Sequence, residues 1–309
     1  MSITRSILYE RLAGVINVVD DKVVQQLVIL FAPQLQFADG ELLRELYSVV
    51  QASPFTSTRA ILKASTGLVF QSFLCAGKVA AVSTSRSILH LGFWKGHRPV
   101  ICKFTVDAQD VLREHKVLDD LWKDPPVTGI VGPVELLTFQ SGARRLAPSG
   151  SHDTARHALV MPVYPATLQH IPVPMAASQV LTWGKQLKAS LEQVHSKGYG
   201  HNDIKAANVF LTSKGECILA DFGSALPLGQ PVNELTTTHW PAELDNPALS
   251  LDDTSIAVDF FQLAVTLLER VGGYRLQRGP MPAMCRAAAD ALDHAELQGF
   301  VFDLLRHQE

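Results

Sequence analysis

Two short motifs carry the residues whose types and spacing could do chemistry: HNDIKAAN at 201–208 and DFG at 221–223. Phosphoryl transfer asks little covalent chemistry of a protein, which must mainly position groups and neutralise charge. In that reaction the carboxylate of Asp203 would orient the acceptor hydroxyl and take its proton. Asn208 and Asp221 would hold a divalent metal between the phosphates. The two motifs therefore predict a phosphoryl-transfer centre.

Lys205 and Gly223 add to this centre. Lys205 follows Asp203 closely enough to reach the γ-phosphate and offset its developing charge. Gly223 lets the chain turn sharply just after Asp221, the expected metal ligand. Either motif alone is a weak signal. The two motifs in this order, after an apolar helical run at 179–197, rarely occur together by chance.

At these motifs the chain resembles the eukaryotic protein kinase family. HNDIKAAN matches the family's catalytic loop, DFG its metal-binding motif, and VICK at 100–103 the strand with its nucleotide-binding lysine. The resemblance implies an α+β, two-lobed protein-kinase-like fold, with a small β-rich N-lobe and a helical C-lobe shortened at its C-terminus. It also implies ATP and Mg²⁺ as cofactors and a protein substrate. Lys205 favours a Ser/Thr acceptor, because tyrosine-specific members lack lysine there.

The resemblance assigns nucleotide contacts outside the two motifs. Lys103 would contact the α- and β-phosphates and form an ion pair with Glu114 on the following helix. Met161 would stand at the gatekeeper position. The hinge at 162–165, which includes Val163, would bind adenine through its backbone.

The family's glycine-rich loop is not matched. Its glycine positions fall near Val82, Thr84 and Ser87, or, in another register, Gly77-Lys78 forms the tip of the loop. The hydroxyls of Ser83, Thr84 and Ser85 could donate hydrogen bonds to phosphates where glycines would bring backbone amides close. Asn202 replaces the arginine that reads a phosphorylated activation loop in the family, which implies activity independent of such phosphorylation. Thr236 falls where Ser/Thr-type members keep a threonine that touches the catalytic loop.

Two further positions match the family. PAE at 241–243 stands where the family carries Ala-Pro-Glu, with the first two residues exchanged. Asp259, inside the apolar run 255–270, matches the buried aspartate that anchors the catalytic loop. A charged residue in such a helix needs a partner, so we expect Asp259 to have a structural role.

Hydrophobic periodicity predicts the elements that must position these residues. Strand-like runs lie at 68–74, 87–91, 99–104, 131–139 and 157–163, and helical runs at 108–122, 179–197, 255–270 and, as one or two helices, 281–306. Strands first and helices afterwards indicate a two-lobed α+β body. We expect a helical N-terminal extension at 1–60, whose helices could dock a partner, and a kinase-like domain at 66–309, divided into an N-lobe (66–162) and a C-lobe (163–309).

Composition narrows the class of protein. Hydrophobic residues make up 47% of the 309 residues, enough for a sizeable core. Lys and Arg number 27 against 30 Asp and Glu, so the near-balanced charge offers no field for nucleic acid or a membrane surface. The four cysteines form no CxxC pair, which argues against zinc or a disulfide framework. With no apolar run long enough to span a membrane, we expect an intracellular protein, in the cytoplasm.

Two alternatives to a protein kinase remain open. In a pseudokinase, the degenerate nucleotide loop would prevent catalysis, and the same fold would serve as a scaffold. A small-molecule phosphotransferase of the aminoglycoside type shares the HxD, Asn and metal Asp pattern. Lys205, the DFG motif and Thr236 favour the protein-kinase branch. The identity of the substrate, the oligomeric state and the role of 1–60 stay open.

Overall fold

The computed structural model describes residues 69–70, 73–78, 87–94, 98–105, 107–132, 134–138, 157–164, 166–232, 239–241, 253–276 and 282–307. The predicted extension at 1–60, the nucleotide-loop residues Ser83, Thr84 and Ser85, and Thr236 lie outside these ranges. The chain forms two compact units. The first combines Met1–His115 with Gly132–Ala166, and the second combines Lys116–Val131 with Thr167–Glu309.

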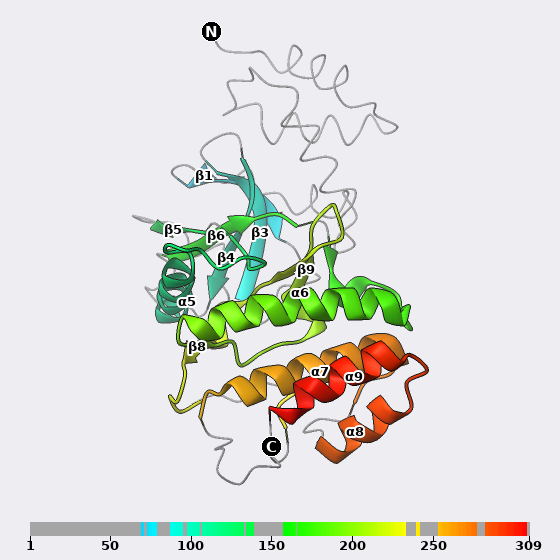
Figure 1. Ribbon diagram of the computed structural model, residues 1–309. Helices are drawn as coiled ribbons and strands as arrows, with labels where there is room; N and C mark the ends of the chain where they lie inside the picture. Colours follow the sequence, from blue (N-terminus) through cyan, green and yellow to red (C-terminus); the bar gives the residue numbers. More distant parts are fainter. Residues whose placement is uncertain are drawn as a thin grey trace, which may run out of the picture. The chain divides into compact units, whose positions relative to one another are not determined.

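The first unit is built on a six-stranded antiparallel sheet of order β1-β2-β3-β4-β6-β5 (Figure 1). Its strands are β1 (Val69–Phe70), β2 (Phe73–Lys78), β3 (Ser87–Trp94), β4 (Arg98–Thr105), β5 (Glu135–Thr138) and β6 (His157–Pro162). The β-rich first half predicted from the sequence is therefore confirmed. Two boundaries differ: β3 continues to Trp94, beyond the predicted run 87–91, and β5 is shorter than the predicted run 131–139.

Strand β4 shows why this sequence forms a central strand. Val100, Cys102 and Phe104 are buried on alternate positions, as one face of a pleated strand requires. In the register with β6, Lys103 lies opposite Leu159, and in the register with β3 it lies opposite Leu89. The lysine is thus held in the middle of the sheet, between two neighbouring strands.

The helix α5 (Ala108–Leu121) follows β4. Its first turn is capped by Asp107, whose Oδ1 accepts a hydrogen bond from the Gln109 amide at 2.9 Å. Val111, Glu114 and Leu118 are buried at helical spacing, which places them on one face. Residues 116–131 belong to the second unit, although the division predicted from the sequence placed them in the first.

Four helices dominate the second unit: α6 (Ala177–Ser196), α7 (Ile256–Gly272), α8 (Pro282–Asp290) and α9 (Ala295–Arg306). In Figure 1, α6, α7 and α9 lie side by side, with α8 against α7 and α9. Helix α7 is buried along most of its length; Ser255 caps its start, and Gly273, at φ 72°, ends it in the left-handed conformation. None of the described helices is long and apolar enough to cross a membrane.

Short elements before α6 and between α6 and α7 surround and carry the motif residues. They are β7 (Ala166–Thr167), η2 (Leu168–His170), β8 (Tyr199–Gly200), η3 (Ala206–Asn208), β9 (Val209–Leu211), β10 (Cys217–Leu219), η4 (Phe222–Ser224) and β11 (Leu226–Pro227). One small sheet has the order β10-β9-β7 and another pairs β11 with β8. The first motif therefore runs from the end of β8 to the start of β9, and Asp221 follows closely after β10.

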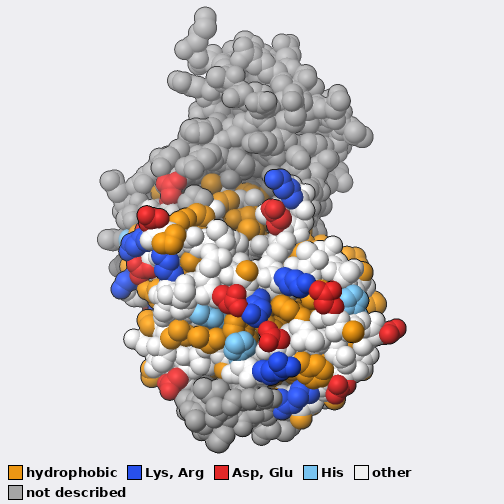
Figure 2. All heavy atoms as spheres, in the orientation of Figure 1, with side chains coloured by type: hydrophobic (Ala, Val, Ile, Leu, Met, Phe, Trp, Pro, Cys, Tyr) orange, Lys and Arg blue, Asp and Glu red, His pale blue; other side chains and the backbone are white. Residues whose placement is uncertain are grey.

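The described surface carries charges of both signs. Figure 2 shows basic and acidic side chains interspersed on the visible face, as the near-equal totals of 27 and 30 suggest.

Candidate active site

The loop that carries the first motif is anchored by Asp259 of α7. Its fully buried carboxylate accepts hydrogen bonds from the backbone amides of His201 and Asn202, each at 2.8 Å. His195 Nε2 donates to the same carboxylate at 2.8 Å. The structure thus confirms the anchoring role that the sequence indicated for Asp259, because three donors offset the cost of burying its charge.

Gln262, one turn further along α7, fixes the next part of the loop. Its Oε1 accepts from the Ile204 amide at 2.8 Å, and its Nε2 donates to the Asn202 carbonyl at 3.0 Å. Gln262 was not among the residues that the sequence motifs indicated. A signal was present, since Asp259 and Gln262 are polar residues at helical spacing in a run that is otherwise strongly apolar.

Asp203 lies at the centre of the loop, between two partners. Lys205 Nζ lies 2.7 Å from its Oδ2 and 3.0 Å from its Oδ1. Asn208 Nδ2 donates to Oδ2 at 2.9 Å and to the Asp203 carbonyl at 2.8 Å. The structure therefore brings together three of the residues that the first motif singled out, with the Asp203 carboxylate in a fixed orientation.

His201 connects this loop to the strand that precedes Asp221. Its Nε2 donates to the Ala220 carbonyl at 3.0 Å, and its Nδ1 accepts from the Asp203 amide at 3.3 Å. Its ring meets Phe222 edge to face, with centroids 4.7 Å apart. With both ring nitrogens engaged by the backbone, His201 acts here as a structural link.

Asp221 stands in a left-handed backbone conformation, with φ 62° and ψ 65°. Few residues other than glycine adopt this conformation, and aspartate and asparagine are among them. The 3-10 turn η4 follows immediately, with Phe222 fully buried. The buried Phe222 side chain thus fixes the turn directly after Asp221.

Asn208 and Asp221 have the chemistry of Mg²⁺ ligands. The amide nitrogen of Asn208 is engaged with Asp203, which leaves its Oδ1 for a cation, and Asp221 supplies a carboxylate. The Ala220 amide donates to the Asn208 carbonyl at 2.9 Å, so a backbone bond ties the two positions together. Hard oxygen donors of this kind suit Mg²⁺, which takes one or two protein ligands and completes its shell with phosphates and water.

The first unit contains the predicted ion pair. Lys103 Nζ lies 2.8 Å from Glu114 Oε2, and only 9% and 2% of the two side chains are exposed. Met161 is buried on β6, opposite Ile101 of β4, and Val163 lies just beyond the end of that strand. The lysine, its partner and the expected adenine-binding residues thus belong to one unit of the fold.

A second contact that the sequence analysis missed involves His239. Its Nδ1 lies 3.1 Å from the Ile204 carbonyl, and its Nε2 lies 3.2 Å from Glu269 Oε2. Burial raises the pKa of Glu269, but the hydrogen bond and charge of His239, the Leu276 amide and the charge of Arg270 together bring it below its ordinary value. Glu269 therefore stays ionised in the core. No local sequence motif predicts this contact, because its residues are far apart in the sequence.

The buried thiols take no part in this chemistry. Cys102, Cys217 and Cys285 are buried and form no disulfide with one another, and burial raises the pKa of Cys217 and Cys285 to about 12. Since the thiolate is the reactive form, Cys217 and Cys285 are poor nucleophiles and poor metal ligands.

Comparison with known proteins points to the same chemistry. Residues 151–285 match the protein kinase domain family. The chain is 29% identical over 117 residues to a serine/threonine-protein kinase US3 homologue of Gallid herpesvirus 2, and 33% identical over 126 residues to a probable cyclin-dependent kinase 9 of Caenorhabditis elegans. The matched segments cover 36% and 40% of this chain but only 29% and 25% of those two relatives.

The fold agrees with these matches. The structure of the Cydia pomonella granulovirus kinase PK-1 superimposes with a TM-score of 0.55 and 16% sequence identity, covering 76% of this chain and 87% of that one. The chain is therefore similar to protein kinases over residues 151–285 and in its fold.

Proposed function

We propose that this chain is an ATP- and Mg²⁺-dependent protein kinase that transfers the γ-phosphoryl group of ATP to a Ser or Thr hydroxyl of a protein. The observation that carries the proposal is the fixed Asp203 carboxylate, held by Lys205 and Asn208 on a loop anchored to α7. The match of residues 151–285 to the protein kinase domain, and the serine/threonine kinases among the relatives, support this class of reaction and acceptor.

In the proposed reaction, Asp203 orients the acceptor hydroxyl and receives its proton. The hydroxyl oxygen attacks the γ-phosphorus, and the bond from that phosphorus to the β,γ-bridging oxygen breaks, so that ADP leaves with the bond's electron pair. Within the described part of the chain, Oδ2 of Asp203 accepts hydrogen bonds from both Lys205 and Asn208, whereas Oδ1 accepts one from Lys205 alone. Oδ1 is therefore the oxygen open to the acceptor. The ammonium of Lys205 offsets charge on the moving phosphoryl group.

We assign Asn208 and Asp221 as the Mg²⁺ ligands, since their oxygens suit a hard cation. When bound, the metal neutralises negative charge on the phosphates. Lys103, held by Glu114, would contact the α- and β-phosphates, and Met161 and Val163 would border the adenine.

The proposal also extends to segments outside the described residues. Ser83, Thr84 and Ser85 would donate hydroxyl hydrogen bonds to the phosphates in place of glycine amides. The kinase domain would comprise residues 66–309, with helices in 1–60 as a docking surface for a partner.

A phosphate-transfer assay tests the proposed function. Wild type is incubated with labelled ATP and Mg²⁺, with a peptide library, a panel of small hydroxyl compounds and autophosphorylation as separate readouts. We expect transfer to peptides, reduced about a thousandfold in kcat by Asp203→Asn, which keeps the size of the side chain but removes the base. Lys103→Met should abolish transfer as well.

The other outcomes separate the alternatives. Transfer to small hydroxyl compounds and not to peptides would make the chain a small-molecule phosphotransferase. Mg²⁺-dependent ATP binding without any transfer, measured by thermal shift, would favour the pseudokinase. Transfer that survives Asp203→Asn would contradict the proposed role of that carboxylate.

A further inference from the structure

Asn202 directly precedes Asp203, the expected general base, and its backbone is bonded to the anchoring helix α7. It is 1% exposed, and its backbone is left-handed with φ 63°. Its amide donates to Asp259 Oδ1 at 2.8 Å, and its carbonyl accepts from Gln262 Nε2 at 3.0 Å. Asparagine and aspartate are among the few residues besides glycine that adopt this conformation readily. The backbone of Asn202 is thus fixed by α7, which leaves its side chain with a defined direction.

The side chain of Asn202 connects the loop to two other segments. Its Nδ2 donates to the Ser224 carbonyl at 3.0 Å and to Thr254 Oγ1 at 3.1 Å. Ser224 ends the η4 turn that begins directly after Asp221, and Thr254 lies just before α7. One amide nitrogen therefore joins the loop of Asp203, the turn of Asp221 and the segment that enters α7.

The orientation of this amide is set by its partners. The Ser224 carbonyl can only accept a hydrogen bond, so the nitrogen and not the oxygen of the amide must face it. The buried Oδ1 of Asn202 has no hydrogen-bond partner among the described residues. Leaving a buried acceptor in that state is unfavourable. The structure accepts this cost and keeps both Nδ2 contacts.

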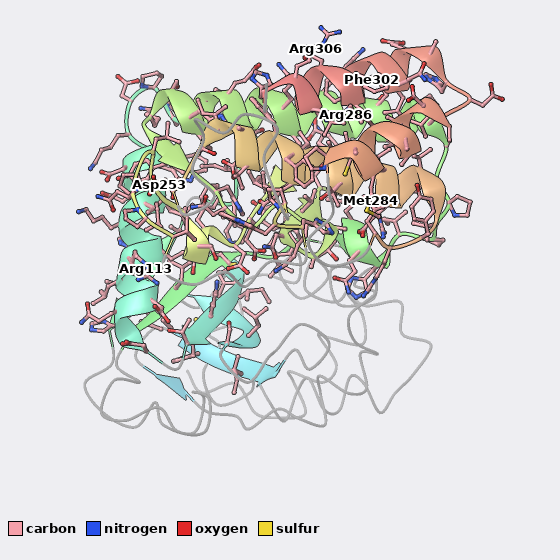
Figure 3. The ribbon with its side chains drawn as sticks, turned by 90° about the horizontal axis from the view of Figure 1, so that it is seen from below. Arg113, Asp253, Met284, Arg286, Phe302 and Arg306 are labelled. Carbon is pink, nitrogen blue, oxygen red and sulfur yellow. The ribbon has the colours of Figure 1, made fainter. Side chains whose placement is uncertain are left out.

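The far end of the connection is also fixed. Thr254 is buried, its amide donates to the Gln230 carbonyl at 2.8 Å, and its carbonyl accepts from the Gly229 amide at 2.9 Å. Its neighbour Asp253 forms a bridge with Pro231 and is labelled in Figure 3 in the segment that leads to α7. Thr254 is therefore a rigid point of attachment and not the end of a loose loop.

From these contacts we infer that Asn202 is a positioning residue for the metal site: through the Ser224 carbonyl it holds the turn after Asp221 in place relative to Asp203 and Asn208. The inference rests on the proposed function, because it concerns the assembly of the same site. Asn202 carries no charge, whereas a buried cation at this position would need an anion to balance it. The turn is therefore held without a phosphate group on the chain.

The test uses the full chain and measures the Mg²⁺ concentration that half-saturates binding of a fluorescent ATP analogue, a readout that does not require transfer. Asn202→Asp keeps the size and the left-handed preference of the residue but replaces the donor that faces Ser224 with an acceptor. We expect the half-saturating Mg²⁺ concentration to rise about tenfold. Asn202→Gly, which relieves the backbone and removes both contacts, should give a similar rise.

Two further variants isolate the Ser224 contact. Thr254→Val removes the hydroxyl partner and keeps the Ser224 bond, so its half-saturating concentration should rise less than that of Asn202→Asp. Gln179→Glu adds the same charge at an exposed position of α6 and should leave the concentration unchanged. Phosphatase treatment of wild type, checked by intact mass, should also leave it unchanged.

The outcomes are distinguishable. If wild type binds the nucleotide with Mg²⁺ dependence and both Asn202 variants keep the wild-type value, the inference is wrong and the proposed function stands. Lower melting temperatures in both variants without a change in Mg²⁺ dependence would reduce Asn202 to a purely structural role and overturn it too. A loss of Mg²⁺ dependence after phosphatase treatment would contradict assembly without phosphate. Wild type that binds no nucleotide at all would overturn both proposals.

Discussion

The two units of the chain hold their key side chains in different ways. In the first unit, Lys103 is positioned by the side chain of Glu114, at 2.8 Å. In the second, Asp259 and Gln262 position the loop around Asp203 through backbone amides and carbonyls. A side-chain partner can be exchanged by mutation together with the residue it holds. A backbone amide cannot, so the second arrangement admits no compensating substitution.

The largest effect is expected at Asp259. In Asp259→Asn, one amide oxygen must replace a carboxylate that accepts from His195 and from the amides of His201 and Asn202. Because buried donors then lose their acceptor, we expect a loss of about 4 kcal/mol in the free energy of unfolding, measured by urea denaturation.

Asp290→Asn, the same change at an exposed position of α8, is the control and should stay within about 0.5 kcal/mol of wild type. A variant of His195 combined with Asp259→Asn should not restore stability, since the two backbone amides remain. If the double variant recovered stability, the claim that backbone contacts admit no compensating substitution would be wrong.

A smaller effect is expected at the ion pair. Lys103→Met deprives the buried carboxylate of Glu114 of the Lys103 ammonium and should cost about 3 kcal/mol of stability. The double variant Lys103→Met/Glu114→Leu removes both charges and should recover most of that loss, although it stays inactive. A double-mutant cycle by urea denaturation measures the recovery. If the double variant loses as much free energy of unfolding as the two single variants together, the expected recovery is wrong. Exchanging a side-chain pair would then be no easier than replacing backbone contacts.

The smallest effect concerns Glu269, which combines both kinds of contact: it accepts from His239 and from the Leu276 backbone amide. Its folded-state pKa is lowered, so ionised Glu269 contributes stability at pH values above its unfolded pKa. That contribution is lost as the pH falls through the folded pKa, below about pH 4.5. We expect Glu269→Gln to unfold with a weaker pH dependence in that window, by about 1 kcal/mol, in urea titrations at stepped pH. Equal pH dependence in both proteins would contradict this.

The site could be predicted from the sequence where its residues are close together along the chain. Asp203, Lys205 and Asn208 fall within one short motif, and the structure brings them into contact. The strand that carries Lys103 was predicted as the short strand-like run at 99–104, and β4 contains that run.

The contacts that hold the site in place could not be predicted in the same way. Gln262 reaches Ile204 from α7, and His239 reaches Ile204 from a segment that precedes α7, so both contacts depend on how distant parts of the chain pack. Hydrophobic periodicity gives the extent of α7 but not which of its few polar side chains meets which backbone group. The assignment of residues 116–131 to the second unit is a tertiary effect of the same kind.

The buried cysteines give the molecule internal reporters. Cys102 lies in the central strand β4, Cys217 in β10 and Cys285 in α8, and all three are shielded from solvent. A thiol reagent can reach each of them only when its surroundings open, so the modification rate of each cysteine measures how often that part of the chain opens. Mass spectrometry of the three labelled peptides would thus measure separately how often three parts of the wild-type protein open. These are the sheet, the strand before Asp221 and the C-terminal helices.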